Sequence, residues 1–220
     1  MKRNLLAAII FLQVALNVPA AEPADPFAKW EAEIRAFEAS DKTNPPPKDA
    51  ILFVGSSSIR FWTNLAECFP DKKTIRRGFG GSKMPDALHF ADRIILPYKP
   101  KQVVVYEGDN DLAAARKPEE IVAEFKTLVE KIHAELPATK VWFLSIKPSP
   151  SRWQYEAIAR QINSEIATYA RDTKNVGYID VWDAMLGPDG KPRDELYIKD
   201  KLHMTPKGYE VWTAIISKKL

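Results

Sequence analysis

Short runs of apolar residues alternate along the chain with longer segments in which apolar residues recur every three or four positions. The runs lie at 51–54, 103–106, 141–146 and 177–181, and a weaker one lies at 74–77. Apolar runs of this length, without polar alternation, are typical of strands buried on both faces of a sheet. The pattern therefore predicts a sheet of about five buried strands.

The longer segments have the spacing of amphipathic helices. The clearest stripe is formed by Ile121, Val122, Phe125, Leu128, Val129 and Ile132. Similar stripes lie within 27–37, 84–95, 158–169 and 209–216, and Asp25 followed by Pro26 predicts the start of the first helix. Strands that alternate with helices predict a three-layer α/β/α sandwich with a central parallel sheet, formed as a single domain over residues 21–220.

The first 20 residues differ from the rest of the chain. Two cations precede the apolar run 5–18, and small residues of the type recognised by signal peptidase follow up to Ala20. We expect residues 1–20 to be a signal peptide, removed after Ala20, and the protein to be exported to the periplasm or the extracellular space. The alternative is a membrane anchor, but Gln13 and Asn17 interrupt a run already shorter than the ~20 residues needed to span a bilayer.

The charge balance gives no sign of a nucleic-acid or membrane partner. The chain has 32 Lys and Arg against 29 Asp and Glu, and loss of the two cations in 1–20 leaves 30 against 29, a net charge of +1. A near-neutral surface offers no electrostatic footprint for nucleic acid or anionic lipid. The single cysteine, Cys68, cannot form an internal disulfide, and we expect a small buried side chain there. A nucleophilic cysteine is the alternative, although no histidine lies near it in sequence.

Serines follow the first predicted strand directly, in the segment Gly55-Ser56-Ser57-Ser58. In an open parallel sheet, ligands bind outside the carboxyl ends of the strands. A hydroxyl at such a strand-to-helix turn would lie beside the free amides of the helix start, which can stabilise a developing oxyanion. Helix capping is the alternative role for these serines, and we expect the helix itself to start near Ile59.

Two further strand ends carry glycine and polar residues. Gly78-Phe79-Gly80-Gly81-Ser82 follows one strand, and Gly108-Asp109-Asn110-Asp111 follows the next. The glycines allow close backbone approach to a ligand, and the Asn110 amide could donate to an oxyanion; tight turns are the alternative for both. The glycine spacing does not fit a dinucleotide-binding motif, and the acidic positions do not fit a calcium loop.

The last cluster, Asp200-Lys201-Leu202-His203, precedes the final predicted helix. A spacing of three residues can bring a carboxylate to Nδ1 of an imidazole, which leaves Nε2 free to accept a hydroxyl proton. The other histidines, His89 and His133, lie inside predicted helices, so His203 is the best-placed general base. A solvated aspartate and a histidine at a helix start are the alternative.

Taken in order, these four clusters resemble the sequence blocks of the SGNH hydrolases, also called GDSL-like lipases and acylhydrolases. The resemblance extends from about residue 51 to the C-terminus, and the segments 79–82 and 200–208 look most like the branch that contains platelet-activating-factor acetylhydrolase-like proteins. It implies the flavodoxin-like SGNH hydrolase fold and a serine esterase that needs neither a metal nor an organic cofactor.

By position, the resemblance implies Ser57 as nucleophile, His203 as general base and Asp200 as the residue that orients it. The oxyanion hole would be formed by the backbone amides of Ser57 and Gly81 and the side chain of Asn110. The family usually has aspartate before the nucleophile, where this chain has Ser56. We expect the Ser56 hydroxyl to replace part of its hydrogen-bonding support.

The resemblance also suggests a substrate class. We expect hydrolysis of a small acyl ester, with an acetyl group on a carbohydrate as the first choice. Lysophospholipase, thioesterase or O-acyltransferase activity at the same site are the enzymatic alternatives. A catalytically silent carbohydrate-binding module, using some of the six tryptophans for stacking, is the non-enzymatic one, although Trp30 and Trp212 fit apolar helix faces and predict core packing.

Overall fold

The computed structural model describes residues 25–220 of the chain. The predicted signal peptide, residues 1–20, lies outside the described residues. Among the helices of the described part, none is long and apolar enough to cross a membrane.

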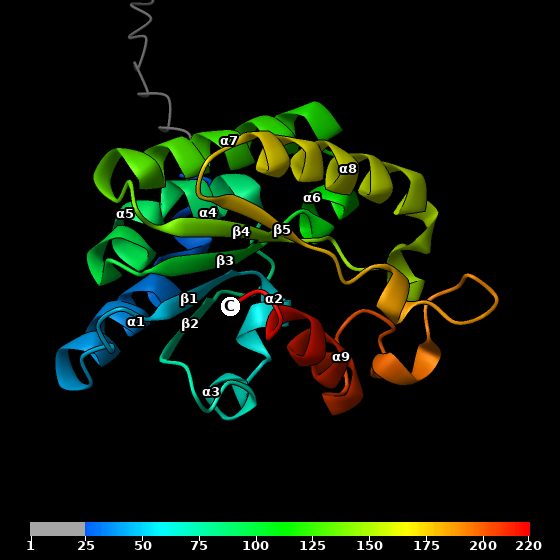
Figure 1. Cartoon of the computed structure of the whole chain (residues 1–220), viewed down its shortest axis with the longest axis horizontal. Helices are drawn as coiled ribbons and strands as arrows, with labels where there is room; N and C mark the ends of the chain where they lie inside the picture. Colours follow the sequence, from blue (N-terminus) through cyan, green and yellow to red (C-terminus); the bar gives the residue numbers. More distant parts are fainter. Residues whose placement is uncertain (1–24) are drawn as a thin grey trace, which may run out of the picture.

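Five parallel strands form a single central sheet (Figure 1). They are β1 (Ile51–Gly55), β2 (Thr74–Gly78), β3 (Gln102–Tyr106), β4 (Lys140–Leu144) and β5 (Val176–Ile179). Their order across the sheet is β2-β1-β3-β4-β5, and every neighbouring pair is parallel. The predicted parallel sheet of about five strands is confirmed.

Helices cover both faces of the sheet, which gives the predicted three layers (Figure 1). One face carries α1 (Glu31–Thr43), α4 (Met84–His89), α5 (Ala91–Ile94), α7 (Pro118–Glu135) and α8 (Glu156–Asp172). The other carries α2 (Ser57–Arg60), α3 (Leu65–Cys68) and α9 (Pro206–Ile216). The short α6 (Asp109–Ala113) follows β3, and 3-10 turns lie at Ala28–Trp30, Leu96–Tyr98, Pro150–Tyr155, Asp183–Met185 and Asp194–Leu196.

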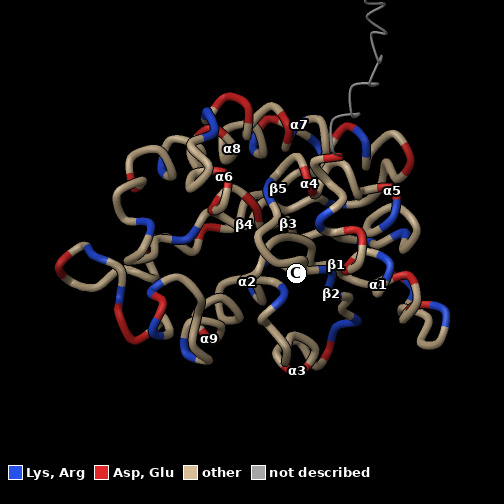
Figure 2. Tube along the Cα trace, turned by 180° about the vertical axis from the view of Figure 1, so that it is seen from behind, with Lys and Arg blue, Asp and Glu red and all other residues tan. Residues whose placement is uncertain are grey.

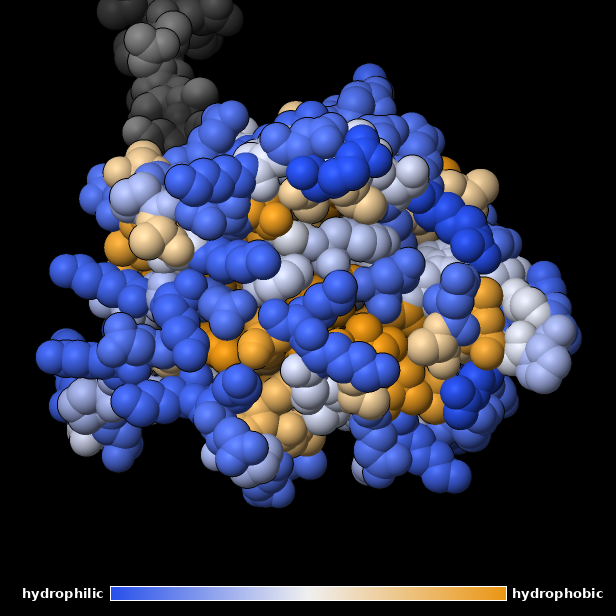
Figure 3. Space-filling view, viewed as in Figure 1, coloured by the Kyte–Doolittle hydropathy of each residue, from blue (hydrophilic) through white to orange (hydrophobic). Residues whose placement is uncertain are grey.

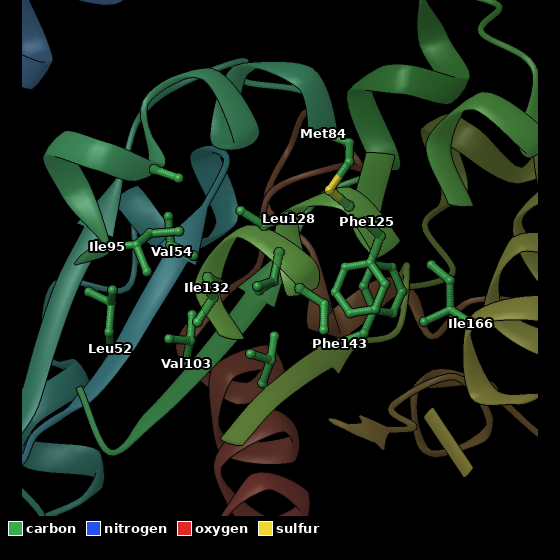
Figure 4. Packing of buried hydrophobic residues seen from close by; sticks show 14 of the residues in the cluster. Leu52, Val54, Met84, Ile95, Val103, Phe125, Leu128, Ile132, Phe143 and Ile166 are labelled. Atoms are coloured by element: carbon green, nitrogen blue, oxygen red, sulfur yellow. The ribbon is translucent and has the colours of Figure 1, made fainter. Parts of the chain in front are cut away.

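The strands divide their side chains between two apolar clusters, one on each face. Leu52 and Val54 belong to the cluster under α7 and α8, part of which is shown in Figure 4, whereas Ile51 and Phe53 belong to the cluster under α9. Successive residues of a strand point to opposite faces, so a strand covered on both sides must be apolar throughout. On the surface shown in Figure 3, hydrophilic side chains cover the helices and apolar residues concentrate across the middle.

The structure differs from the sequence predictions at several element ends. The stripe at 84–95 forms two helices, since the backbone at Phe90 (φ −86°, ψ 3°) leaves the helical conformation between α4 and α5. The first helix is preceded by a turn, in which the Asp25 carboxylate accepts from the Phe27 amide, and by a 3-10 turn. Cys68 is half-buried rather than buried, because it ends the short α3, where its sulfur accepts a hydrogen bond from the Trp62 indole.

The sheet order brings three strand ends together. β1 lies between β2 and β3, and Gly55 is paired with Gly78 on one side and with Tyr106 on the other. The chain thus leaves β1 at the point where the strand order reverses, which is where open parallel sheets bind their ligands. The serine, glycine and asparagine clusters follow these three strands, so the topology alone makes them neighbours.

Candidate active site

The nucleophile candidate lies on a turn that only glycine can precede. At Gly55 (φ +150°), a Cβ would lie 2.1 Å from the carbonyl oxygen of Tyr106 on the adjacent strand. Ser56 follows in an extended conformation as the N-cap of α2, and the helix starts at Ser57 rather than near Ile59 as predicted. This early start places Ser57 at the first helical position, where its N–H cannot be used by the helix.

Three side chains form a continuous hydrogen-bonded line at this turn. Ser57 Oγ lies 2.8 Å from His203 Nε2, and His203 Nδ1 lies 2.6 Å from Asp200 Oδ2. Ser57 and His203 are 146 residues apart in sequence, so the fold itself creates this contact. A hydroxyl, an imidazole and a carboxylate in this order can transfer the hydroxyl proton to the imidazole as the oxygen attacks a carbonyl.

The loop before α9 holds the Asp200–His203 pair by backbone contacts. Asp200 Oδ1 accepts hydrogen bonds from the amides of Leu202 and His203, both at 2.9 Å. The His203 carbonyl accepts from the Ile198 amide, and Lys201 adopts a left-handed conformation (φ +59°) that turns the loop back. The carboxylate and the ring are therefore fixed relative to each other before any substrate binds.

The same contacts keep Asp200 ionised. Partial burial raises the pKa of its carboxyl, but hydrogen bonds from the His203 ring and from the His203 and Leu202 amides outweigh this effect and lower the pKa to about 2. A carboxylate that remains charged near neutral pH stabilises the imidazolium formed when the ring accepts a proton. The orientation of His203 is thus maintained throughout the neutral range.

The glycine loop after β2 has an open side next to this line. Gly81 has a left-handed conformation (φ +77°), and a Cβ at this position would meet nothing within 4 Å. Within residues 25–220, the N–H groups of Gly81 and Ser57 make no hydrogen bond to another residue. The loop is held from below by the Trp30 indole N–H, which donates to the Gly80 carbonyl at 3.0 Å.

Asn110 joins the glycine loop to the end of β3. Its Nδ2 donates to the Ser82 carbonyl at 2.9 Å, which uses one of the two amide hydrogens and leaves the other available. Asn110 lies in α6, directly after Gly108, whose positive φ of 109° makes the sharp turn out of the strand. The structure thus links the three loops on which the predicted oxyanion donors lie.

Buried charged side chains support this arrangement from beneath. Asp109 pairs with Lys147 at 2.6 Å, and both side chains are almost fully buried. Asp111 accepts from the Gly108 and Met84 amides and pairs with Arg116 at 2.9 Å. These contacts fix the residues on both sides of Asn110. From the sequence alone, Asp109 and Asp111 were seen only as possible turn residues, and Lys147 was missed because its partner lies 38 residues away.

Glu107 is a second fully buried carboxyl of this region, beside Asp111. It is fully buried, and its Oε1 accepts a hydrogen bond from the Ser82 hydroxyl at 2.6 Å. Burial, followed by the negative charge of Asp111, raises the pKa of Glu107 well above its ordinary value. The residue therefore holds Ser82, and with it the glycine loop, from a site that disfavours the charged form of its carboxyl.

Near the serine, one residue lacks its expected role and another has a contact that the sequence did not indicate. The Ser56 hydroxyl makes no hydrogen bond to another residue of the described chain, so the expected support from this side chain is absent. Phe61 was not singled out from the sequence, yet its ring packs edge-on against His203, with ring centroids 4.8 Å apart, while remaining 49% exposed. An exposed ring beside the imidazole is a natural contact for a substrate.

The other candidates from the sequence lie elsewhere. His89 stacks on Phe27, and His133 contacts the Thr139 carbonyl at the far end of α7. The described residues contain no group of three or more histidine, cysteine or acidic side chains arranged to hold a metal ion. Trp30 and Trp212 are buried, in agreement with the predicted core packing.

Comparisons with known proteins identify the family and the fold. Residues 53–211 match the model of the GDSL-like lipase/acylhydrolase family. The chain is similar in structure to a Streptococcus pneumonia protein proposed to be a platelet activating factor, with a TM-score of 0.76, 20% identity, and coverage of 88% of this chain and 94% of that one.

Two further structures extend the comparison. A GDSL-like lipase from Bacteroides thetaiotaomicron matches with a TM-score of 0.71, 21% identity, and coverage of 86% of this chain and 97% of that one. An acetylxylan esterase from Geobacillus stearothermophilus matches with a TM-score of 0.64, 12% identity, and coverage of 79% of this chain and 94% of that one. At these identities the structures show a shared fold. No curated protein matches the chain.

Proposed function

The chain belongs to the GDSL-like lipase/acylhydrolase family, and from this premise we propose that Ser57, His203 and Asp200 are its catalytic triad. The family is one of serine carboxylic ester hydrolases, so the enzyme needs an activated serine. The observation that carries the proposal is the continuous line of two short contacts, 2.8 Å and 2.6 Å, from Ser57 Oγ through the imidazole to Asp200.

The first half of the proposed reaction transfers the acyl group to the enzyme. Ser57 Oγ attacks the ester carbonyl carbon while His203 Nε2 accepts the hydroxyl proton. The carbonyl oxygen becomes an oxyanion, which the free amides of Ser57 and Gly81 and the second Nδ2 hydrogen of Asn110 stabilise. The intermediate then collapses, and His203 returns its proton to the departing alcohol oxygen.

The second half releases the acid. Water attacks the acyl-serine carbonyl as His203 accepts one of its protons, and the same donors stabilise the second oxyanion. Collapse of this intermediate returns the proton to Ser57 Oγ and liberates the carboxylic acid. Every proton is carried by His203, so the scheme requires no metal or organic cofactor.

For the substrate, we propose an acetyl ester on a carbohydrate. Support comes from the structural match to an acetylxylan esterase and from the exposed Phe61 ring beside His203, since an aromatic face can pack on a sugar.

A series of 4-nitrophenyl acetate, butyrate and octanoate tests the acyl length. A rate that rises with chain length would favour a lysophospholipase or thioesterase, and acyl products formed with an added sugar acceptor would favour an acyltransferase.

The test of the triad is labelling with a fluorophosphonate probe, followed by mass spectrometry of the modified peptide. We expect one adduct on Ser57, and its loss in His203→Ala. Ser56→Ala and Ser58→Ala serve as matched controls from the same turn, and both should label as the wild type does. Absence of labelling in a folded sample would instead support the silent binding module, and an adduct on Ser56 or Ser58 would reassign the nucleophile.

We also propose that the protein acts outside the cytoplasm. The support is the sequence pattern of residues 1–20, which has the order of cations, apolar run and small residues of a signal peptide. Expression of the full chain in a bacterium, followed by intact-mass measurement of the periplasmic fraction, should give a protein that starts at Ala21. A cytoplasmic protein of full mass would contradict the proposal.

A further inference from the structure

A cavity lies between α1, β2 and α2, the short helix that starts at Ser57. Its volume is about 420 Å³, which is in the range of small-molecule binding sites. The lining includes Glu33, Phe37, Arg60, Phe61, Arg76 and Gly78. The cavity therefore combines apolar walls with two guanidinium groups, and Figure 2 shows basic positions at both α2 and β2.

The cavity shares its wall with the catalytic turn. Ser57 and Arg60 begin and end α2, and Phe61 is its C-cap in a helical conformation. The three residues are spaced i, i+3 and i+4, so their side chains lie on the same side of this helical segment. The Phe61 ring contacts His203, and a Cβ at Gly80 would lie 2.6 Å from Nη1 of Arg60. The Arg60 guanidinium thus lies against the glycine loop, about one helical turn from the nucleophile.

The two arginines of β2 differ in whether their charge is paired. Successive strand residues face opposite sides of the sheet, so Arg76 and Arg77 point to different faces. Arg77 pairs with Asp41 and is bonded to Tyr98, whereas Arg76 has no carboxylate partner among residues 25–220. The only side-chain hydrogen bond of Arg76 within this part of the chain is to the carbonyl of Arg60, at the end of α2.

The cavity consequently holds an excess of positive charge. Arg60 pairs with Glu33 at 3.3 Å, with both side chains partly exposed, and this leaves the charge of Arg76 uncompensated. Partial burial lowers the pKa of Arg76; the nearby Tyr209 phenol opposes this effect and the charge of Arg77 adds to it. A bound anion would remove this imbalance, and arginine binds carboxylates in well-defined planar geometry.

We propose that this cavity is a subsite for a carboxylate on the alcohol part of the ester, as in an acidic sugar. The inference rests on the proposed function, because it places the reacting ester at Ser57. Phe61 would contact the ring that carries the ester, and Arg60 and Arg76 would bind its carboxylate. The enzyme would then prefer esters of acidic alcohols to those of neutral ones.

Two model esters test the preference: 4-acetoxybenzoate, in which one ring separates the acetyl ester from a carboxylate, and its neutral counterpart 4-acetoxybenzamide. The measured quantity is the ratio of their kcat/KM values on each variant, so that differences in chemical reactivity cancel. We expect Arg60→Met to lower this ratio by roughly three- to tenfold, as for loss of a partly exposed charge pair.

A second variant is expected to change the kcat/KM ratio in the opposite direction. Glu33→Gln removes the carboxylate that competes for Arg60, so the ratio should rise, whereas a merely structural role for the Arg60–Glu33 pair would give no opposite shifts. The matched control is Arg35→Met on α1, which removes one exposed cation paired with Glu31 and should leave the ratio within twofold. Thermal melts of each variant confirm that it is folded.

The possible failures are distinct. If Ser57→Ala abolishes hydrolysis of both esters but neither Arg60→Met nor Glu33→Gln shifts the ratio, the subsite is wrong and the proposed function stands. An equal fall in Arg35→Met would show a general charge effect and would also overturn the subsite. If the wild type hydrolyses neither ester, or Ser57→Ala retains full activity, the proposed function fails and the subsite with it.

Discussion

Two carboxyl groups at the same edge of the sheet have opposite ionisation behaviour. Asp200 is 45% exposed, and hydrogen bonds from His203 and the adjacent amides hold its pKa at about 2. Glu107 is fully buried, and burial raises its pKa well above the ordinary value. The first is available as a charged partner for an imidazole, whereas the second belongs to the framework, where burial disfavours its charged form.

The comparison extends to the two regions in which these residues lie. The surface line consists of Ser57, His203 and Asp200. The buried support consists of Glu107, Asp109, Asp111 and Lys147, beneath Asn110. Water can partly replace a lost partner in the surface line but not in the buried support. Substitutions in the surface line should therefore change the rate, and those in the buried support should change the stability first.

The largest effect expected is the loss of activity in Ser57→Ala. Removal of the nucleophile leaves only the oxyanion donors and substrate binding, so kcat for 4-nitrophenyl acetate should fall by about 10⁴-fold or more. The free energy of unfolding in urea should change by less than about 1 kcal/mol, because His203 is the only hydrogen-bond partner of the side chain within residues 25–220. A folded variant with a tenfold loss or less would remove Ser57 from the proposed triad.

Lys147→Met should have the largest effect on stability. The change leaves the Asp109 carboxylate buried without its cation, which costs about 3–5 kcal/mol in other proteins. We expect a fall of this size in the urea unfolding free energy. The double variant Lys147→Met/Asp109→Asn should recover part of it, because the unpaired Asp109 charge is removed as well.

An ion pair on the surface, with a similar distance between its charged atoms, serves as the control for Lys147→Met. Lys131 and Asp92 are 2.7 Å apart but partly exposed, so Lys131→Met should cost less than about 1 kcal/mol. Equal losses in Lys131→Met and Lys147→Met would show that burial does not separate the two regions, and the comparison would fail.

Asn110→Ala tests the residue that connects the regions. Its side chain is held by the Ser82 carbonyl, and its second amide hydrogen is proposed to bind the oxyanion. Loss of one such donor costs about 3 kcal/mol of transition-state stabilisation, so kcat should fall roughly a hundredfold while KM changes little. Near-normal kcat in a folded variant would exclude Asn110 from the oxyanion hole.

The sequence was sufficient for the sheet because doubly buried strands must be apolar throughout, and such runs stand out in a chain with 28% charged residues. It also predicted that the serine, glycine and asparagine loops would meet, because a parallel sheet brings the ends of neighbouring strands together, whereas the choice of Ser57 among the three serines rested on the family resemblance. The break between α4 and α5 at Phe90 was missed, because the apolar stripe continues across it. The spacing of apolar residues carries no information about the backbone conformation of a single residue.

The contacts that support the site could not be predicted in the same way. Lys147 lies just beyond a strand end and looks like a solvated surface residue, yet the sheet places it over Asp109. Arg60 ends a helix of four residues and Phe61 is its C-cap, so this segment is too short to show any periodicity. Such contacts depend on which strand ends are adjacent and how closely α2 packs on β2, which are properties of the assembled fold.

The smallest effect, and the one with the most specific signature, is expected in Glu107→Gln. Because the folded state raises the pKa of Glu107 above the ordinary value of 4.5, the folded protein binds a proton that the unfolded chain has lost. The wild type is therefore most stable with respect to this group below pH 4.5, and loses stability as the pH rises toward the folded-state pKa. Glutamine is uncharged at every pH and should abolish this slope.

The variant and the wild type should consequently diverge as the pH rises. Unfolding in urea at pH 5 and pH 8 should show a growing stability advantage of Glu107→Gln, with a slope of at most about 1.4 kcal/mol per pH unit. The control is Glu135→Gln on the exposed face of α7, for which the difference should stay constant. Parallel pH curves for Glu107→Gln would mean that Glu107 is ionised in the folded protein, and the contrast with Asp200 would then concern exposure alone and not charge.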